Sequence, residues 1–176
     1  MSAPNPSSIS AVVISLNESA KIERCLSSLS FCDDIVLVDS GSTDNTVALA
    51  EAMGARVITQ SWLGFGRQKQ FAVDQAKYDW VLCIDADEVV SAALQAEIQG
   101  LDFAADTTAA CRFPRRNHFL GKPLNYGEGY PDLSLRLFNR RQAYWSDDTV
   151  HEMVVADGPV KILRGDLLHF SEDSIA

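Results

Sequence analysis

The chain of 176 residues has no long apolar run and a shortage of positive charge. Its longest apolar stretches, such as residues 11–16, fall far short of the roughly 18–20 residues that span a bilayer, so we expect no membrane-spanning helix. Residues 1–10 lack the basic and apolar regions of a secretory signal, which favours a cytoplasmic location. Lys and Arg number 15 against 24 Asp and Glu, for a formal net charge of −9. This balance argues against a protein that binds nucleic acid by neutralising phosphates.

Cysteine is also scarce, and its spacing is not that of a paired metal site. Cys25, Cys32, Cys83 and Cys111 lie mostly among apolar residues. We expect reduced, buried thiols rather than disulfides or zinc ligands.

What the chain does contain fits one globular domain. With 47% apolar and 22% charged residues it can fill a core and is not disordered. The whole excess of acidic residues lies within residues 1–110, whereas residues 111–176 have balanced charge and are rich in Arg. We therefore expect a single domain, residues 1–176, whose two halves divide at about residue 102.

Short apolar runs alternate with amphipathic segments over the first hundred residues. We expect buried strands at residues 11–16, 34–39, 55–59 and 80–84. The intervening and following segments predict helices at residues 20–29, 43–53, 66–76 and 92–100, with Gly54 ending the second. This alternation predicts an α/β fold with a mostly parallel sheet and helices on both faces.

The second half has a different pattern. Residues 111–113 and 134–139 are expected strands, and residues 150–155 and 161–169 are expected to be extended. Residues 117–131 are rich in Gly, Pro, Asn and Tyr and are expected to form a loop. We therefore expect a mixed or antiparallel β part.

An acidic cluster follows the fourth expected strand, where an apolar run ends in Asp85, Asp87 and Glu88. Two carboxylates two residues apart at a strand end can both face one hard cation such as Mg²⁺ or Mn²⁺. Such a cation can neutralise a diphosphate. The alternative is a solvated strand end, which is more common for a single Asp than for this cluster.

Polar clusters also end the first two expected strands. Residues 15–18 close the first strand, and residues 39–44, with Gly41, close the second. Taken alone, each is explained as a turn followed by a helix cap. Because the carboxyl ends of parallel strands meet at one edge of a sheet, the three clusters together favour a ligand site there.

Together these segments resemble a family-2 glycosyltransferase of the GT-A (Rossmann-like) fold. The resemblance rests on VVISLNESAKIERCLSSL, DDIVLVDSGSTDNTVALAE, WLGFGRQKQFAVDQAKYDWVLCIDADE and the later LRLFN and VHE, and it spans roughly residues 9–170. The W-x-GFG-x-QK run and the DADE form are most similar to lipopolysaccharide-core β-glucosyltransferases that extend the inner-core heptose. The resemblance implies an inverting enzyme that transfers a hexose, glucose, from a UDP-sugar to a lipopolysaccharide-core or related glycan acceptor, with Mg²⁺ or Mn²⁺. It also implies peripheral contact with the cytoplasmic face of the inner membrane.

The resemblance implies roles for the matching residues. Those implied to bind the nucleotide or the sugar are Leu16, Asn17, Glu18, Asp39, Gly41, Ser42, Gln68, Lys69 and Asp85. Asp87 is implied to hold the metal, with His169 as a further ligand. Residues 1–102 then form the nucleotide-sugar half and residues 103–176 the acceptor and catalytic half. The resembled enzymes continue for several tens of residues, so we expect this chain to lack their C-terminal helical extension.

An inverting transfer also needs a carboxylate to take the proton of the attacking hydroxyl. The resemblance places this base in an acidic motif well after the aspartate pair, and Glu152 is our choice. Its competitors are Glu128, Asp132 and the pair Asp147 and Asp148, and His151 is a candidate to orient a carboxylate.

Arginine suits bidentate contacts with phosphate, at the diphosphate or on a phosphorylated acceptor. Arg136 is the strongest candidate, because its strand is expected to run near the site, whereas most of the others are expected to be solvated. Four aromatic residues are candidates to stack on sugars, with a core position as the alternative: Trp62, Tyr126, Tyr130 and Trp145.

Two other functions stay open. One is a non-catalytic nucleotide-sugar-binding module. The other is a phosphatase with Asp85 as nucleophile, since residues 84–89 fit an h-DxDx[TV] pattern. That superfamily usually has the motif on its first strand, whereas three expected strands precede it here.

Overall fold

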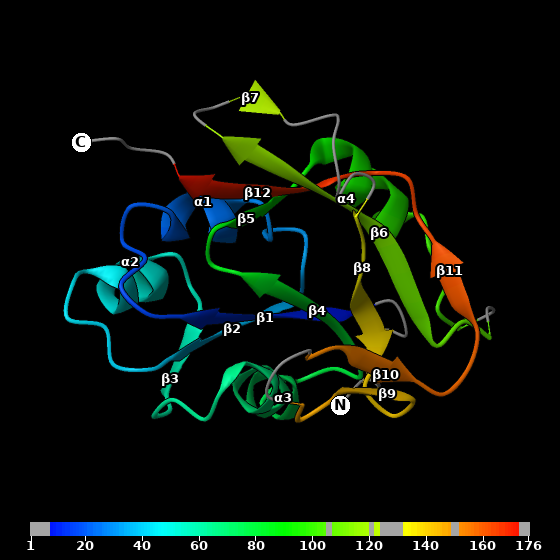
Figure 1. Ribbon diagram of the computed structural model, residues 1–176, viewed down its shortest axis with the longest axis horizontal. Coiled ribbons are helices and arrows are strands. Elements are labelled where there is room, and N and C mark those ends of the chain that lie inside the picture. The colour runs from blue at the N-terminus through cyan, green and yellow to red at the C-terminus, as the bar shows by residue number, and fades with distance from the viewer. Residues whose placement is uncertain (1–7, 105–106, 120–121, 124–131, 149–151, 173–176) are drawn as a thin grey trace.

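The computed structural model describes residues 8–104, 107–119, 122–123, 132–148 and 152–172. Within these ranges a ten-stranded sheet has the order β3-β2-β1-β4-β8-β6-β12-β5, and β7 and β11 also pair with β6. β9 and β10 form a separate two-stranded sheet. Figure 1 shows the large sheet crossing the molecule, with β9 and β10 beside α3.

The first four strands form the predicted parallel part of the sheet. They are β1 (Ile9–Ser15), β2 (Asp34–Asp39), β3 (Arg56–Thr59) and β4 (Trp80–Asp85). β1 lies between β2 and β4, and β3 pairs with the outer side of β2. The carboxyl ends of β1, β2 and β4 therefore meet at one edge.

Helices cover both faces of this sheet, as predicted. α1 (Ile22–Ser27), α2 (Thr46–Ala52) and α4 (Ala92–Gln99) lie on one side, and α3 (Phe65–Asp74) lies on the other (Figure 1). Gly54 follows the end of α2 with φ +88°, the left-handed conformation of a helix-ending glycine.

Alternate residues of the strands supply two apolar cores. Leu37 and Leu82 pack in the core under α1, α2 and α4. Val36 and Val81, their neighbours along the chain, pack in the core that includes Val73 of α3. Because successive strand side chains point to opposite faces, the continuous apolar runs in the sequence serve both cores.

The second half is a mixed β part, as expected. Its strands are β5 (Glu88–Val90), β6 (Ala110–Phe119), β7 (Lys122–Pro123), β8 (Asp132–Asn139), β9 (Ala143–Trp145), β10 (Val154–Ala156), β11 (Val160–Ile162) and β12 (Leu167–Glu172). β8 is antiparallel to β4 and to β6. β12 is parallel to β6 and antiparallel to β5.

Three local predictions were wrong. β6 continues into the loop expected from residue 117, because β12 and β7 supply ladder partners there. β5 and β9 were not predicted, since each is only three residues long. The extended segment expected at residues 161–169 divides into β11 and β12, which pair with different parts of β6.

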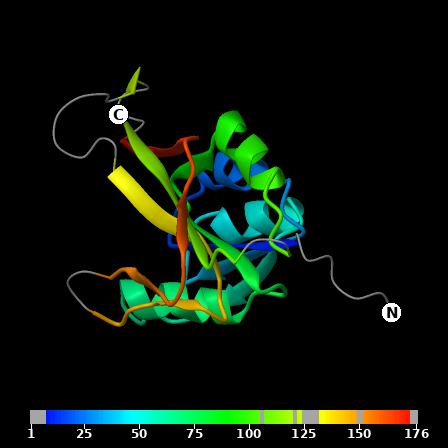
Figure 2. The same ribbon diagram turned by 90° about the vertical axis from the view of Figure 1, so that its right-hand side faces the viewer.

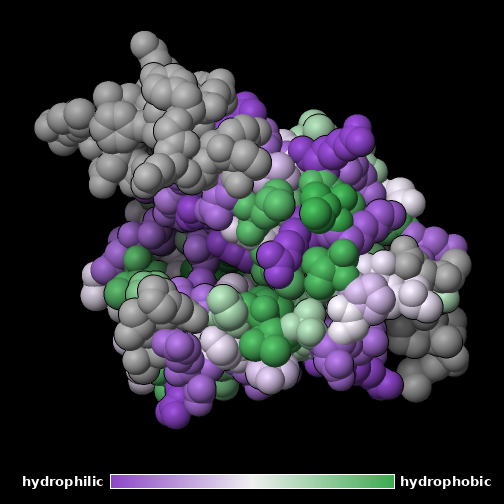
Figure 3. All heavy atoms as spheres, turned by 45° about the vertical axis from the view of Figure 1, so that its right-hand side comes forward, coloured by the Kyte–Doolittle hydropathy of each residue, from purple (hydrophilic) through white to green (hydrophobic). Residues whose placement is uncertain are grey.

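The surface and the cysteines agree with a compact fold. All four cysteines are free, and three of them are buried. No helix of the described ranges combines the length and apolar character needed to cross a membrane. Figure 2 shows β9 and β10 beside α3 at one end of the sheet. Figure 3 shows apolar side chains gathered on one face, and exposed ones such as Tyr144, Val155 and Ile162 come from β9, β10 and β11.

Candidate functional site

A cleft of about 520 Å³ opens at the carboxyl ends of β1 and β4. Its walls come from the end of β1, the turn after β4 and the segment before α3: Ile14, Ser15, Leu16, Glu18, Ser40, Trp62, Phe65, Asp85, Ala86 and Asp87. Five residues that the sequence analysis selected lie together here: Leu16, Glu18, Trp62, Asp85 and Asp87. The volume is in the range typical of small-molecule sites.

Glu88 fixes the turn that carries the two aspartates. Its side chain is fully buried, and its Oε1 accepts a hydrogen bond from the backbone N–H of Asp85 at 2.7 Å. The acidic run of the sequence thus divides. Asp85 and Asp87 line the cleft, and Glu88 points into the protein beneath them.

Two arginines neutralise Glu88. Arg136 of β8 donates to both of its carboxylate oxygens, at 2.8 and 3.0 Å, and Arg115 of β6 donates to Oε2. Burial alone would raise the pKa of Glu88, but Arg136 and then Arg115 outweigh burial and lower it.

The fixed position of Arg136 limits its predicted role at a phosphate. Arg136 also donates to the Cys83 carbonyl at 3.1 Å, and it lies 3.8 Å from the Asp85 carboxylate. Its guanidinium therefore supports the turn from below. The phosphate contact of Arg136 stays a prediction.

His169 reaches Asp87 across the sheet. β12 lies between β5 and β6, in a register that sets His169 opposite Glu88 on one side and Asn117 on the other. The His169 Nε2 is 2.9 Å from Asp87 Oδ2, and its Nδ1 is 2.8 Å from Asn117 Oδ1. Since an amide oxygen only accepts, Nδ1 carries the proton, and Nε2 is the ring atom that faces Asp87.

The chemistry of Asp87 and His169 fits a divalent cation. One carboxylate oxygen and one imidazole nitrogen converge, and a hydrogen bond orients the ring, as is usual for metal-binding histidines. Their 2.9 Å separation is that of a hydrogen bond, and it is also close to the edge of about 3.0 Å between neighbouring ligands of an octahedral ion with bonds of about 2.1 Å. Within the described ranges no three His, Cys, Asp or Glu side chains are grouped as a ligand set. The remaining ligands of such a cation would therefore be substrate oxygens and water.

The cleft is strongly acidic. Burial raises the pKa of Glu18, and the nearby charges of Asp87, Asp44 and Asp85 raise it further, while Lys21 opposes the change. Like charges this close disfavour one another's ionised forms. An anionic ligand would therefore enter this cleft more readily together with a cation.

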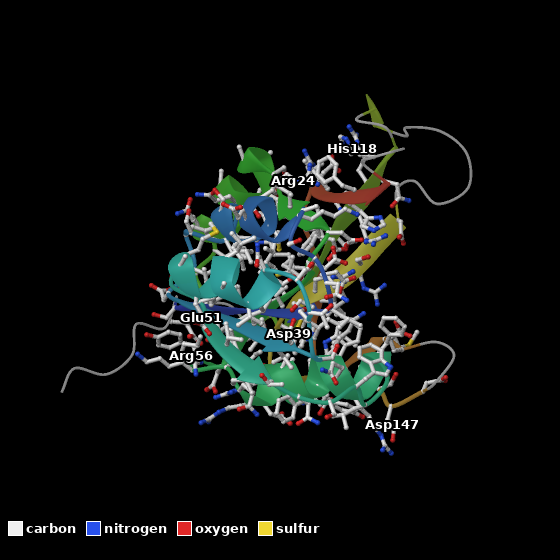
Figure 4. The ribbon with its side chains drawn as sticks, turned by 90° about the vertical axis from the view of Figure 1, so that its left-hand side faces the viewer. Arg24, Asp39, Glu51, Arg56, His118 and Asp147 are labelled. Atoms are coloured by element: carbon white, nitrogen blue, oxygen red, sulfur yellow. The ribbon has the colours of Figure 1, made fainter. Side chains whose placement is uncertain are left out.

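Asp39 lies beside the cleft, next to Ser40 of its lining, and its predicted contact with the nucleoside stays a prediction. Asp39 is only 2% exposed. Its carboxylate accepts hydrogen bonds from two hydroxyls, Ser15 Oγ and Ser42 Oγ, and from the N–H groups of Gly41 and Ser42. These donors outweigh burial and lower its pKa. In Figure 4 Asp39 lies within the body of the molecule. Its carboxylate shapes the turn that brings Ser40 to the cleft.

Asn17, Gly41 and Ser42 hold the same edge together. Asn17 has a φ of 53°; its N–H donates to Ser42 Oγ at 2.8 Å, and its Oδ1 accepts from the Thr43 N–H at 2.8 Å. Gly41 has a φ of +115°, which L side chains rarely adopt. These contacts join the β1 and β2 ends. Direct ligand contact by the three residues stays a prediction.

Gln68 is fully buried. Its side chain donates to the Gln60 carbonyl at 3.2 Å and accepts from the Leu63 N–H at 3.1 Å. It therefore fixes the segment before α3, and its predicted ligand contact stays a prediction. That segment presents Trp62 and Phe65 to the cleft as a perpendicular ring pair with centroids 4.8 Å apart.

Lys69 and Glu152 lie in a second cavity, of about 300 Å³. The Lys69 Nζ is 3.6 Å from Glu152 Oε1 and 4.5 Å from the centre of the Trp145 ring. Trp145 is 7% exposed and donates from Nε1 to Cys83 Sγ, so its ring binds a lysine and packs in the core. A sugar-stacking role for Trp145 is therefore not supported.

The other candidates for the base are spread over the molecule. Asp147 and Asp148 line a third cavity, of about 490 Å³, that shares Trp62 and Phe65 with the cleft. Figure 4 shows Asp147 beyond α3. Asp132 is exposed at the start of β8. Glu128, Tyr126, Tyr130 and His151 lie outside the described residues.

Several residues of the site were not selected from the sequence. Asn117 and Arg115 were missed because they belong to the part of β6 expected to be loop or surface. Phe65 was missed although it belongs to the aromatic, Gly-rich segment that contains Trp62. Glu88 was grouped with the aspartates that face the ligand, and only its position after the turn indicated that it is buried.

Comparison with known proteins agrees with this geometry. The family described as glycosyl transferase family 2 matches residues 10–156. The lipopolysaccharide core biosynthesis glycosyltransferase LpsC of Rhizobium meliloti is 38% identical over 169 residues, 92% of this chain and 63% of that protein. The uncharacterized glycosyltransferase RT0209 of Rickettsia typhi is 35% identical over 95% of this chain and 61% of its own length. The chain thus spans about three fifths of these relatives.

Two solved structures have a similar fold. Glucosyl-3-phosphoglycerate synthase from Mycobacterium tuberculosis, in complex with Mn²⁺, UDP and glucosyl-3-phosphoglycerate, matches with a TM-score of 0.53 and 28% identity, over 62% of this chain and 44% of that one. S. aureus TarS 1–349, in complex with UDP-GlcNAc, matches with a TM-score of 0.67 and 14% identity, over 95% and 59%. At that identity the TarS likeness concerns the fold alone.

Proposed function

The chain belongs to the family-2 glycosyltransferases and has their GT-A fold, and on this premise we propose that it transfers glucose from UDP-glucose, with inversion, to a lipopolysaccharide-core glycan. The observation that carries the proposal is the cleft at the carboxyl ends of β1 and β4, which Asp85 and Asp87 line and where His169 lies 2.9 Å from Asp87. A bound divalent cation would neutralise the diphosphate and stabilise it as a leaving group.

The donor is proposed to occupy the 520 Å³ cleft. Leu16, 52% exposed, and the Trp62–Phe65 pair offer apolar surface for a base or a sugar ring. Glu18 and Asp85 offer acceptors for sugar hydroxyls, and Asp87 and His169 would hold the cation. Mycobacterial glucosyl-3-phosphoglycerate synthase, bound to UDP and Mn²⁺, supports a UDP-sugar and a divalent metal here.

Glu152 is proposed as the base. In the transfer, the acceptor oxygen forms a bond to the anomeric carbon, the bond from that carbon to the diphosphate breaks, and the acceptor proton passes to the Glu152 carboxylate. Lys69 orients that carboxylate from 3.6 Å. Ile14 and Asp85 of the cleft and Lys69 of the second cavity line one buried void of about 10 Å³, so the proposed donor and base sites lie close together.

The glycan acceptor is proposed from the likeness to LpsC, whose name assigns it to lipopolysaccharide core biosynthesis. Residues 1–102 would then bind the donor, and residues 103–176 would contribute the base and part of the acceptor site. We propose that the enzyme works at the cytoplasmic face of the inner membrane, where such acceptors are assembled.

The test is an assay of glucose transfer from UDP-glucose to a heptose-terminated lipopolysaccharide core with Mn²⁺ or Mg²⁺, in which NMR identifies the new linkage. We expect a β linkage, and we expect Asp87→Asn to lose donor binding and transfer together. Glu152→Gln should keep UDP-glucose binding and lower the transfer rate by about 10²–10⁴.

Other outcomes would favour the alternatives. UDP-glucose binding without transfer to any core acceptor, in wild type and Glu152→Gln alike, would indicate a binding module. Phosphorylation of Asp85 by a phosphomonoester would indicate a phosphatase. Failure of both the wild type and Asp87→Asn to bind UDP would overturn the donor site.

A further inference from the structure

The cavity that holds Lys69 and Glu152 differs in charge from the donor cleft. The charged residues that line the cleft are Glu18, Asp85 and Asp87, all acidic. Those that line the second cavity are Lys69, Arg112, Arg136 and Glu152. A buried void of about 10 Å³, large enough for about one water, has both Asp85 of the cleft and Lys69 of the second cavity in its lining, so the two spaces lie close together.

Most of the charge in the second cavity is already neutralised. Glu152 pairs with Lys69 at 3.6 Å, and Arg136 is bound to Glu88 by two hydrogen bonds. Arg112 is the exception. Its side chain is exposed, and within the described ranges its guanidinium makes no ion pair.

Arg112 is nevertheless held firmly in place. Its backbone belongs to β6, in register with Leu135 of β8 and with Ile162 of β11. Its carbonyl accepts from the Leu163 N–H at 2.7 Å. A guanidinium on a strand paired on both sides is well suited to bidentate recognition of a planar or tetrahedral anion. The hydroxyl-bearing Ser134 lines the same cavity.

We propose that the acceptor carries an anionic group, a phosphate monoester or a carboxylate, near its reacting hydroxyl, and that Arg112 binds this group. This assignment rests on the proposed transfer reaction, because that reaction places the acceptor in the second cavity beside Glu152. An anion at Arg112 would balance a charge that has no ion-pair partner among the described residues, and the acceptor hydroxyl would then lie toward Glu152. The donor diphosphate is a poor occupant, because it would belong to the metal end of the other cleft.

The experiment compares three probes that differ in one substituent: glucose, glucose 6-phosphate and glucuronate. Their binding to the full chain is measured by saturation-transfer NMR at about 0.15 M salt, with UDP and Mn²⁺ present to fill the donor cleft. We expect at least one anionic probe to bind about tenfold more tightly than glucose, since hydrogen bonds to a charged group are worth about that factor or more. Preference for the phosphate or for the carboxylate identifies the source of the charge.

Arg112→Gln should remove this preference and leave UDP affinity and thermal stability unchanged. The matched control is Arg141→Gln, which loses one exposed arginine that pairs with Asp79 outside the cavity. Equal binding of the three probes, or equal effects of Arg112→Gln and Arg141→Gln, would overturn the proposal. UDP binding is recorded separately, so that a failed donor site is distinguished from a failed anion site.

Discussion

Asp85, Asp87 and Glu88 are one acidic run in the sequence, but their surroundings are different. Asp87 faces His169 in an open cleft, whereas Glu88 is fully buried between Arg115 and Arg136. A buried charge is tolerated only with partners, and Glu88 has three: two guanidinium groups and the Asp85 N–H. Glu88 thus orients the two aspartates that are proposed to face the ligand.

Glu88→Gln tests this dependence. The amide would leave the Arg136 guanidinium buried without its counter-charge, which we expect to cost roughly 3–5 kcal/mol in the free energy of unfolding. The cost is measured by urea denaturation. Glu51→Gln, the same change at an exposed site of α2, should cost less than about 0.5 kcal/mol. Equal stability of the two variants would contradict a structural role for Glu88.

Asp34 lies at the opposite end of the sheet, and its surroundings predict how the stability of the protein depends on pH. Partial burial would raise its pKa, but hydrogen bonds from Arg56, Ser10 Oγ and the Lys77 N–H outweigh burial and lower it. A carboxyl whose pKa is lower in the folded state stabilises the protein above its unfolded pKa of about 4. That stabilisation is lost as the pH falls toward the folded pKa.

Asp34→Asn is therefore expected to cost about 1–2 kcal/mol at pH 7 and progressively less below pH 4. Chemical denaturation between pH 3 and pH 7 measures the difference. Asp74→Asn, which removes a charge from the exposed face of α3, is its control. A constant difference between wild type and Asp34→Asn over this range would contradict the linkage.

At the scale of elements, α3 lies unusually close to the chain between β9 and β10. A Cβ added at Gly66 would overlap the Ser146 carbonyl oxygen and approach Glu152 Cβ at 3.4 Å. The glycine thus lets α3 approach the segment that carries the proposed base. Gln70 reinforces the contact, since its Oε1 accepts from the Trp145 N–H at 2.8 Å.

Gly66→Ala should separate these elements. We expect a loss of about 1–3 kcal/mol, typical of overpacking, and a transfer rate that falls more than UDP affinity does. Thermal melting, UDP titration and the transfer assay measure these effects. Gly100→Ala, at the end of α4 where a Cβ meets only ordinary contacts, should change none of them. Unchanged transfer in Gly66→Ala would show that this contact does not position Glu152.

The elements differ in how far the sequence alone could predict them. β1, β2 and β4 are buried on both faces, so their continuous apolar runs predicted them well. β5 and β9 have three residues each and depend on partners far along the chain, β12 and β10, which no local pattern reveals. β6 carries Arg115, Arg116 and Asn117, which look like surface residues until β8 and β12 are placed beside them.

The same distinction applies to the site. Glu18, Asp85 and Asp87 were predictable because strand order alone brings their strand ends together. Asp39 and Gln68 were assigned to the ligand by the resemblance, yet their polar groups bind neighbouring backbone and hydroxyls. Whether a polar side chain faces a ligand or a loop depends on its rotamer, which the sequence pattern does not determine.

At the scale of the whole molecule, the uneven charge along the chain has a spatial counterpart. The acidic first half provides the acids that line the donor cleft, and the second half provides Arg112 and Arg136, which line the second cavity. A dianionic donor would meet repulsion from Glu18, Asp85 and Asp87 unless a cation accompanied it.

Removal of divalent metal should therefore abolish most donor binding. With Mn²⁺ and UDP at about 100 times its Kd we expect stabilisation of about 2.7 kcal/mol, which corresponds to roughly 5–10 °C in Tm. With EDTA, UDP should give a shift below about 1 °C. Thermal melting in the four combinations of metal and nucleotide measures this coupling, and an undiminished shift in EDTA would contradict it.

The position of β12 has a consequence for how the enzyme becomes active during synthesis. The strands that bear Asp85 and Asp87 leave the ribosome early, but His169 belongs to the last strand described and must insert between β5 and β6. The proposed cation site is therefore complete only after the chain has been made through residue 169. Premature termination or proteolysis just before residue 167 would remove one of the proposed metal ligands together with the strand that pairs with both β5 and β6.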